Sequence, residues 1–321
     1  MHRSANSPTR TPSTANTANI SYTGRFAPSP SGPLHFGSLV CALASYLDAR
    51  VNNGRWLVRI EDIDPPREQP AAASSILTCL EHHHLFWDGE IVYQSGRTES
   101  YLETLRQLRD HSLSYRCDCT RKRLAGLNGS YDGYCLRRGI DSSTPAAVRL
   151  DVLRSLANIS DLANPVTFID GIQGKRSENL LVAGDYVIHR KDGLFAYQLA
   201  VVVDDIWQNI THVVRGADLL DTTARQILLF RLLGKPAPHY SHVPVMVDAQ
   251  GNKLSKQNRA PAIDNAGAGD NLYMALRVLG LNPVAELERA PPEYLIEWAV
   301  NQWHPGKVGK TPNIIAPVIK Q

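Results

Sequence analysis

The sequence has no long hydrophobic run. It contains 321 residues, of which 43% are hydrophobic and 20% charged, a composition typical of a globular chain with a substantial core. The length suggests about two domains. No apolar stretch reaches the ~18 residues that a membrane-spanning helix needs. We therefore expect a soluble protein without membrane contact.

The first nineteen residues contain no acidic side chain and no apolar segment. A secretory signal requires an apolar segment, so we expect a cytoplasmic protein. Ser, Thr, Asn and Pro dominate this stretch, which predicts a flexible extension over residues 1–20. Arg3 and Arg10 leave an organellar transit peptide as an alternative, although no Leu or aromatic residue is present to build its amphipathic face.

Cysteine is scarce, and five cysteines without a secretory signal argue against a disulfide framework. Three of them, Cys117, Cys119 and Cys135, lie within nineteen residues. Clustered thiolates favour one structural Zn²⁺, which requires a fourth ligand. Tyr131 is our first candidate for that ligand, and Tyr134, water or a distant His remain open. The other cysteines lie in apolar helical patterns and are expected to be core thiols: Cys41 and Cys79.

The charge balance is mildly basic, with a net charge of +3 and a pI near 8.6. These values are compatible with a nucleic-acid partner without requiring one. Basic residues flank the cysteine cluster at 121–123 and 137–138. They predict an RNA contact, with a solvated surface as the alternative.

An anion site is predicted where a strand over 22–27 meets a helix that begins at His35 and ends near Asn52. The turn between them is rich in Pro, Gly and Ser. Free N–H groups and the helix dipole favour a negatively charged ligand at a helix N-terminus. Gly32 and Gly37 have no β-carbon, which lets a base or phosphate approach the backbone.

The elements that follow predict a parallel α/β sheet. A second strand over 56–62 delivers Glu61, a helix-turn-helix stretch spans 69–84, and another helix spans 98–112. Ligands of such sheets bind beyond the carboxyl ends of the strands, where both His35 and Glu61 are expected.

Residues 115–195 interrupt this pattern with cysteines, turns and short strands, which indicates an inserted subdomain. The chain returns to the first domain with an apolar and then acidic run over 196–205. Two helices over 269–279 and 292–303 end the pattern. We expect five parts: the extension 1–20, the catalytic domain 21–114 and 196–262, the zinc-bearing, RNA-contacting insert 115–195, and the C-terminal helical region 263–321.

Two short motifs resemble signatures of class I aminoacyl-tRNA synthetases. His35-Phe36-Gly37-Ser38 is similar to the HIGH signature, and Lys253-Leu254-Ser255-Lys256-Gln257 to the KMSKS signature. The resemblance implies the Rossmann-type sheet of that class and activation of a carboxylate by ATP with Mg²⁺. The implied catalytic residues are His35, Lys253 and Lys256. The implied ATP-binding residues are Pro30, Gly32, His35, Gly37, Ser38 and Lys256.

From Gly24 to about Pro261 the chain resembles the glutamate branch of that class. The matching segments are 24–30, 59–64, 194–200 and 214–218. Arginines can clamp carboxylates, and acidic or phenolic groups can receive an ammonium. The implied L-glutamate site consists of Arg25, Ala27, Ser29, Glu61, Tyr197 and Arg215. Structural ion pairs with Asp62, Asp64 or Asp218 are the alternative for the arginines.

The cysteine spacing and the 65 residues after Lys256 are similar to the glutamyl-queuosine tRNA(Asp) synthetase family. This resemblance implies tRNA-independent activation of glutamate and its transfer to the queuosine base at the wobble position of tRNA(Asp). The sequence departs from the family in its N-terminal leader. It departs from the general KMSKS signature at Gln257. We expect a monomer.

Three alternatives remain open at this point. A truncated or non-discriminating glutamyl-tRNA synthetase would charge the tRNA 3′ end. A small nucleotidyltransferase would share the ATP motifs but would not need the glutamate residues or the zinc insert. A non-catalytic RNA-binding relic is disfavoured by the intact His35, Lys253 and Lys256.

Overall fold

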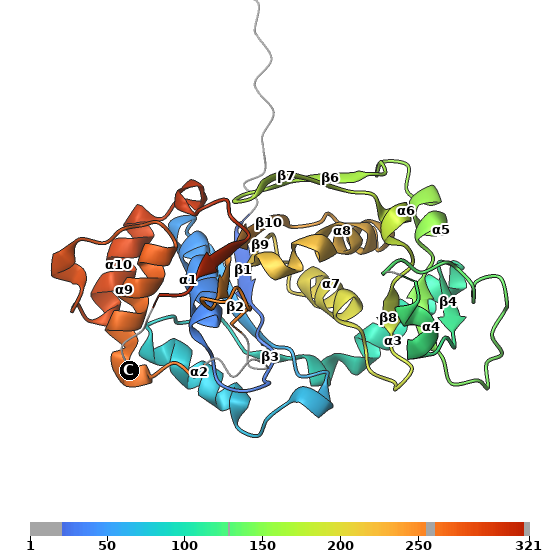
Figure 1. Ribbon diagram of the computed structural model, residues 1–321, viewed down its shortest axis with the longest axis horizontal. Helices are drawn as coiled ribbons and strands as arrows, with labels where there is room; N and C mark the ends of the chain where they lie inside the picture. The colour runs from blue at the N-terminus through green and yellow to red at the C-terminus, as the bar shows by residue number, and fades with distance from the viewer. Residues whose placement is uncertain (1–20, 128, 255–260, 318–321) are drawn as a thin grey trace, which may run out of the picture.

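The computed structural model describes residues 21–127, 129–254 and 261–317 (Figure 1). The helices are α1 (Phe36–Val51), α2 (Ala72–His82), α3 (Thr98–Asp110), α4 (Arg121–Ala125), α5 (Val152–Ala157), α6 (Leu180–Ala183), α7 (Tyr197–Trp207), α8 (Thr223–Leu232), α9 (Ala268–Val278) and α10 (Pro292–Gln302). The strands are β1 (Thr23–Phe26), β2 (Arg55–Ile60), β3 (Val92–Tyr93), β4 (Ser114–Cys117), β5 (Ala147–Leu150), β6 (Val166–Asp170), β7 (Gly174–Glu178), β8 (Val187–His189), β9 (His212–Gly216), β10 (His239–Val243), β11 (Val245–Val247) and β12 (Asn313–Ile315).

Parallel strands form the centre of the molecule. β1, β2 and β3 pair in that order, with Arg25 opposite Leu57, and β10 pairs with β9. The two sets lie side by side, because the backbone N–H of Thr211 donates to the carbonyl of Thr23 at 2.9 Å just before β9 begins. The predicted parallel α/β architecture is confirmed. Its ligand-binding edge is the one where β1, β2 and β9 end.

Helix α1 packs against the sheet through residues four apart, Leu39, Leu43 and Leu47, which are fully buried. Truncating such a leucine to alanine typically costs about 2 to 5 kcal/mol. Helices α9 and α10 lie beside α1 (Figure 1) and share its hydrophobic core. The two C-terminal helices predicted from sequence are therefore confirmed, and they hold α1 and its N-terminus in place.

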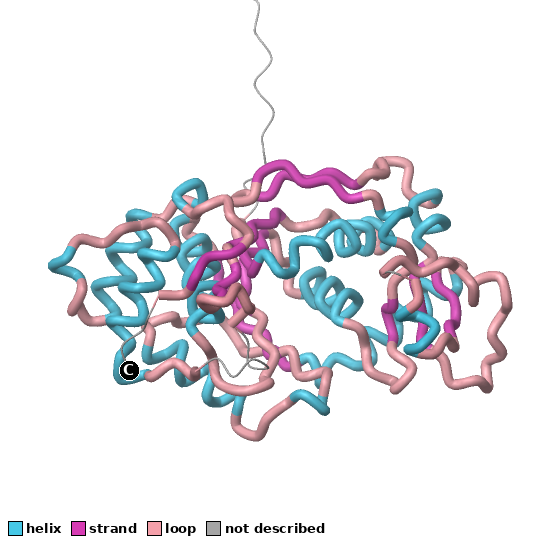
Figure 2. Tube along the Cα trace, viewed as in Figure 1, coloured by secondary structure: helices cyan, strands magenta, loops and turns pink. Residues whose placement is uncertain are grey.

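The segment after α3 builds a separate antiparallel sheet, in the order β4, β5, β8. The β6–β7 hairpin extends from this region back toward the central sheet (Figure 2), where the N–H of Gly171 donates to the carbonyl of Tyr240 in β10 at 2.9 Å. A second hydrophobic core joins α3, α7, α8 and this segment. The hairpin thus brings Asp170 to the central sheet.

The helix-turn-helix predicted over 69–84 is wrong. The structure has a single helix there, α2, which begins at Ala72. Pro70 and the left-handed conformation of Ala71 leave room only for a turn before α2. None of the helices in the described residues is long and apolar enough to cross a membrane.

Candidate active site

A cavity of about 580 Å³ opens at the carboxyl ends of β1 and β9 and at the N-terminus of α1. Nine of the predicted site residues line it: Arg25, Ala27, Ser29, His35, Gly37, Ser38, Tyr197, Arg215 and Lys253. Glu61, Pro30 and Gly32 lie outside its lining. Ser255, Lys256 and Gln257 lie outside the described residues.

His35 is the N-cap of α1. Its Nδ1 accepts a hydrogen bond from the backbone N–H of Ser38 at 3.2 Å, and its Nε2 lies 3.1 Å from the Ser38 hydroxyl. Gly37 comes so close to the imidazole that a β-carbon there would lie 3.2 Å from the ring. The predicted helix N-terminus is therefore present on the cavity wall, with its dipole directed at the space.

Arg25 and Arg59 share a buried carboxylate. Nε of Arg25 donates to Oδ1 of Asp205 at 3.1 Å and Nη2 to Oδ2 at 3.3 Å. Nη1 of Arg59 lies 2.8 Å from the same carboxylate. Burial acts to raise the pKa of Asp205, but the two guanidinium groups hold it below its ordinary value. The alternative ion-pair partners expected from the sequence were Asp62, Asp64 and Asp218. In the structure the partner of Arg25 is Asp205.

Glu61 follows β2 and is held by its backbone N–H, which donates to the carbonyl of Pro28 at 3.0 Å. Its carboxylate accepts from Arg59 at 3.4 Å and is buried. Burial raises the pKa of Glu61, against the opposing effect of Arg59 and Arg25. A nearby cation would favour its ionised form.

Arg215, on β9, is only 6% exposed, and its contacts are all to neutral groups. Nη1 donates to Oε1 of Gln226 at 2.7 Å and to the Tyr197 hydroxyl at 3.2 Å, and Nη2 donates to the Thr223 hydroxyl at 3.0 Å. In the described part of the chain Arg215 forms no ion pair with a carboxylate. A buried cation of this kind at a cavity is a site for an anionic ligand.

Behind Arg215 lies His242, its partner in the β9–β10 register. Nε of Arg215 donates to Nε2 of His242 at 2.9 Å, and Nδ1 of His242 lies 2.5 Å from Oδ2 of Asp170. Sequence reasoning missed both residues, because Asp170 belongs to the segment that we expected to contact RNA. The contact of His242 with Arg215, and of Asp170 with His242, exists only in the folded chain.

Lys253 lies at the mouth of the cavity, where its ammonium pairs with Asp218 at 2.6 Å. The chain on both sides of the undescribed residues 255–260 borders the cavity. The N–H of Leu254 donates to Met246, and Ala262 forms a β-bridge with His35. Lys253 and Leu254, the described part of the second signature, therefore line the same cavity as His35, Gly37 and Ser38 of the first.

Cys41 corrects one prediction. Expected in the core, it is half-buried and lies on the cavity wall, although burial raises the pKa of its thiol to about 12. It is one turn beyond Gly37 on α1, and this spacing was a signal that the sequence contained. Cys79 is a core thiol, as predicted.

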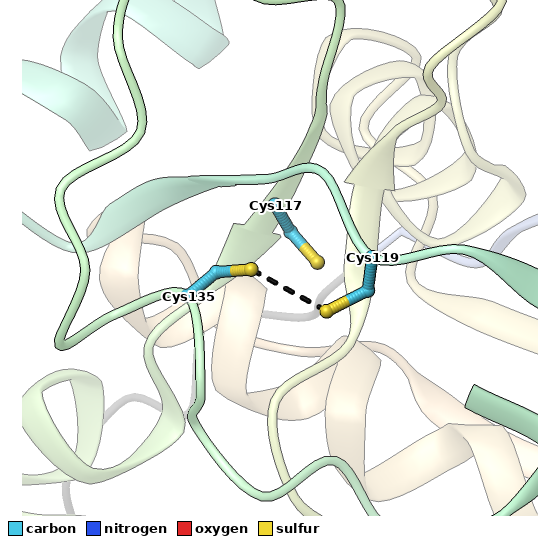
Figure 3. A group of neighbouring side chains, drawn as sticks. All are labelled: Cys117, Cys119 and Cys135. Atoms are coloured by element: carbon cyan, nitrogen blue, oxygen red, sulfur yellow. Dashed lines mark hydrogen bonds between the residues drawn. The ribbon is translucent and has the colours of Figure 1, made fainter. Parts of the chain in front are cut away.

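The remaining cysteines form a cluster outside the cavity. The Sγ atoms of Cys117, Cys119 and Cys135 lie within 4.8 Å of one another and point inward (Figure 3). Cys117 ends β4, and the others come from the following loops. Three convergent sulfurs form a donor set that fits a metal such as zinc.

Tyr131 and Tyr134, the two candidates for the fourth ligand, occupy different places. The Tyr131 hydroxyl lies 3.5 Å from Sγ of Cys117 and 3.4 Å from Sγ of Cys119. Tyr134 is 40% exposed, and its ring lies between the guanidinium groups of Arg123 and Arg138. Of these two tyrosines, Tyr131 has its oxygen at the sulfur cluster, where Oδ1 of Asp118 also lies 3.3 Å from Sγ of Cys135.

Comparison with known proteins agrees with this geometry. Residues 22–282 match the catalytic-domain model of class I tRNA synthetases for E and Q. The chain is 50% identical over 286 residues to a Glutamyl-Q tRNA(Asp) synthetase of Ectopseudomonas mendocina, covering 89% of this chain and 94% of the relative. It is 49% identical to one of Escherichia coli strain K12, covering 88% and 89%.

Among solved structures, the glutamate-tRNA synthetase of Elizabethkingia anophelis superposes with a TM-score of 0.74 at 25% identity, over 91% of this chain and 67% of that one. A glutamate tRNA ligase of Elizabethkingia meningosepticum in complex with its amino acid gives 0.73 at 26%, over 90% and 66%. The chain therefore belongs to the class I synthetase-like ligases for glutamate and glutamine and, within them, to the glutamyl-Q tRNA(Asp) synthetase family.

Proposed function

We propose that this protein activates L-glutamate with ATP in the absence of tRNA and transfers it to the queuosine base at the wobble position of tRNA(Asp). The observation that carries the proposal is the buried Arg215 guanidinium, which faces the cavity with no carboxylate of its own in the described chain. The names of the relatives support the acceptor.

Arg215 is the residue that would bind the side-chain carboxylate of glutamate. Leaving the guanidinium unpaired costs free energy, which an anionic ligand recovers through charge-assisted hydrogen bonds. A glutamine side chain carries no charge and would recover less. The contacts with Gln226 and Thr223 fix the plane of the guanidinium before the ligand arrives.

The other end of glutamate would contact the residues around β1. Arg25 holds Asp205 through Nε and Nη2, which leaves Nη1 without a hydrogen-bond partner among the described residues. Glu61 and the Tyr197 hydroxyl would receive the ammonium, and Ala27 and Ser29 would border it from the loop after β1. Glu61 lies outside the present cavity lining and must come into reach for this contact.

ATP would occupy the side of the cavity formed by the start of α1. His35, Gly37 and Ser38 line that side, and Pro30 and Gly32 lie in the segment that joins β1 to α1. Lys253 and Lys256 would neutralise the triphosphate, assisted by Mg²⁺ bound to ATP. Lys253 must then exchange Asp218 for phosphate.

The first chemical step forms one bond and breaks one. An α-carboxylate oxygen of glutamate attacks the α-phosphorus of ATP, and the bond to the bridging oxygen breaks, releasing pyrophosphate and leaving glutamyl-adenylate. His35 and the N-terminus of α1 would stabilise charge on the α-phosphate, and the lysines would stabilise the leaving group. In the second step a queuosine hydroxyl attacks the activated carbonyl, loses its proton and displaces AMP.

The tRNA would be bound by the segment 115–195, inserted between catalytic parts 21–114 and 196–262, whereas α9 and α10 of the C-terminal region pack against α1. Basic side chains at 121–123 and 137–138 belong to this segment, and most are exposed. Zn²⁺ would be held by Cys117, Cys119, Cys135 and Tyr131, fixing the loops that carry these basic residues. The monomeric state and cytoplasmic location remain predictions.

The test of activation is ATP–pyrophosphate exchange with purified protein and no tRNA. We expect exchange that depends on glutamate and is not supported by glutamine. Lys256→Ala should abolish it, and equal exchange by that variant would remove the signature loop from the mechanism. Lys307→Ala, a change in the C-terminal region away from the cavity lining, is the matched control for losing one ammonium.

The acceptor is tested by locating labelled glutamate after nuclease digestion of tRNA(Asp) with and without queuosine. We expect label in the anticodon fragment of the queuosine-containing tRNA alone. Label in the 3′-terminal adenosine fragment would favour the truncated glutamyl-tRNA synthetase. Absence of both exchange and transfer would favour the non-catalytic relic.

A further inference from the structure

The cation proposed to recognise glutamate belongs to a buried chain of hydrogen bonds that reaches into the inserted segment. Arg215 contacts His242, and His242 contacts Asp170, at 2.9 Å and 2.5 Å. The side chains of His242 and Asp170 are both fully buried. Asp170 ends β6, about 45 residues before Arg215 along the chain.

The protonation state of His242 follows from its neighbours. A guanidinium can only donate, so Nε2 of His242, which faces Nε of Arg215, must carry a lone pair. The ring proton therefore lies on Nδ1 and is donated to Oδ2 of Asp170. Burial lowers the pKa of His242, which agrees with a neutral imidazole.

Asp170 is itself fixed in orientation. Its Oδ1 accepts from the backbone N–H groups of Ile172 at 3.0 Å, Gln173 at 2.8 Å and His242 at 3.1 Å. Three donors on one oxygen leave only Oδ2 to face the imidazole. The carboxylate cannot rotate without losing these bonds.

We propose that Asp170 and His242 are positioning residues for glutamate recognition. Asp170 selects the Nδ1–H tautomer of His242. The unprotonated Nε2 of this tautomer accepts from Nε of Arg215 and so holds the Nη groups of Arg215 toward the cavity. The proposal rests on the glutamate site proposed above. This arrangement also keeps the carboxylate of Asp170 from pairing directly with the guanidinium of Arg215. Asp170 stabilises Arg215 through an intervening neutral ring, so the positive charge of Arg215 remains available to the substrate carboxylate.

Asp170→Asn is the diagnostic substitution because it keeps the shape of the side chain and replaces one carboxylate acceptor by an NH₂ donor. The amide oxygen must replace Oδ1 to serve the three backbone N–H groups, so the NH₂ group faces Nδ1 of His242. The imidazole then takes the Nε2–H tautomer, and this N–H meets Nε–H of Arg215. Two donors face each other, and Arg215 must move.

The first measurement is the tautomer of His242 by ¹⁵N NMR, which requires no activity. We expect Nδ1–H in the wild-type protein and Nε2–H in Asp170→Asn. Nε2–H in the wild type would overturn the proposal, whether or not the enzyme activates glutamate. This readout separates failure of the positioning relay from failure of the proposed function, which would show as missing exchange in the wild type.

The second measurement is exchange kinetics. We expect Asp170→Asn to raise KM for glutamate about tenfold or more, while KM for ATP stays within about twofold. His242→Phe, which removes the acceptor, should behave alike. His242→Gln supplies an amide that accepts from Arg215 and donates to Asp170, so its KM should rise less, and it serves if Asp170→Asn does not fold.

Tyr22→Phe is the control for losing a buried hydrogen bond to a carboxylate, since Tyr22 donates to Asp48 at 2.6 Å and lies outside the cavity lining. It should lower stability and leave both KM values unchanged. If Asp170→Asn lowers kcat and raises both KM values in proportion, or changes no more than Tyr22→Phe, Asp170 is only structural and the proposal fails.

Discussion

Arg25 and Asp205 form a two-bond ion pair in which both side chains are at most 4% exposed. Arg59 contacts the same carboxylate, and Asp204 lies 3.9 Å from Arg59. The arginine on β1 is thus compensated by a carboxylate, whereas Arg215 has no carboxylate partner among the described residues. We therefore expect Arg215, rather than Arg25, to depend on an anionic ligand for its counter-charge.

Removing the carboxylate charge at position 205 should destabilise the fold. Asp205→Asn removes a buried negative charge beside Arg25 and Arg59, and both guanidinium groups stay buried. Breaking a buried pair in this way costs about 3 to 5 kcal/mol in the free energy of unfolding. Urea denaturation measures it. Asp192→Asn, which removes an exposed partner of Arg190, should cost under about 1 kcal/mol, and an equal loss in both variants would contradict the argument.

The same pair predicts a dependence of stability on acid. The pKa of Asp205 is lower in the folded protein than in the unfolded chain, where it is about 3.9. Its contribution is therefore complete above about pH 5 and is lost as pH falls through the folded pKa. Denaturation between about pH 5 and pH 2 should show a shallower loss in Asp205→Asn than in the wild type. Parallel profiles would exclude this carboxylate as a source of acid sensitivity.

His35 caps α1, and two substitutions separate this structural role from the catalytic role proposed for it. Asn caps helices well, so His35→Asn should keep the stability of α1, whereas His35→Ala should lose about 1 kcal/mol. Both remove the imidazole from the α-phosphate, and we expect exchange to fall by about 10²- to 10³-fold in each. Thermal unfolding and exchange rates together check this. Activity that tracks stability alone would show that His35 only caps the helix.

The fourth zinc ligand is tested by Tyr131→Phe, with Tyr134→Phe as the matched control. Because the Tyr131 hydroxyl lies at the sulfurs and the Tyr134 ring packs against arginines instead, Tyr131→Phe should lower zinc affinity and Tyr134→Phe should not. The purified wild type should contain one zinc per chain, and the double substitution of Cys117 and Cys119 by Ser should lose it. Metal content by mass spectrometry and competition with a chelator measure both. Unchanged affinity in Tyr131→Phe would favour water as the ligand.

The sequence predicted elements whose cause is local. The Pro-, Gly- and Ser-rich turn before His35 predicted where α1 begins, because the start of a helix depends on a few consecutive residues. The cysteine spacing likewise indicated a cluster. The prediction failed over 69–84, where prolines before Ala72 outweighed the helical pattern.

Only the tertiary structure decided which charges meet. Asp205 lies 180 residues from Arg25, and Asp170 lies 72 residues from His242. Nothing in the spacing of these residues distinguishes Asp205 from Asp62 or Asp218 as a partner for Arg25. Ion pairing depends on distance in space and on burial, and both are set only when folding brings Asp205 of α7 to Arg25 of β1 and Asp170 of β6 to His242 of β10.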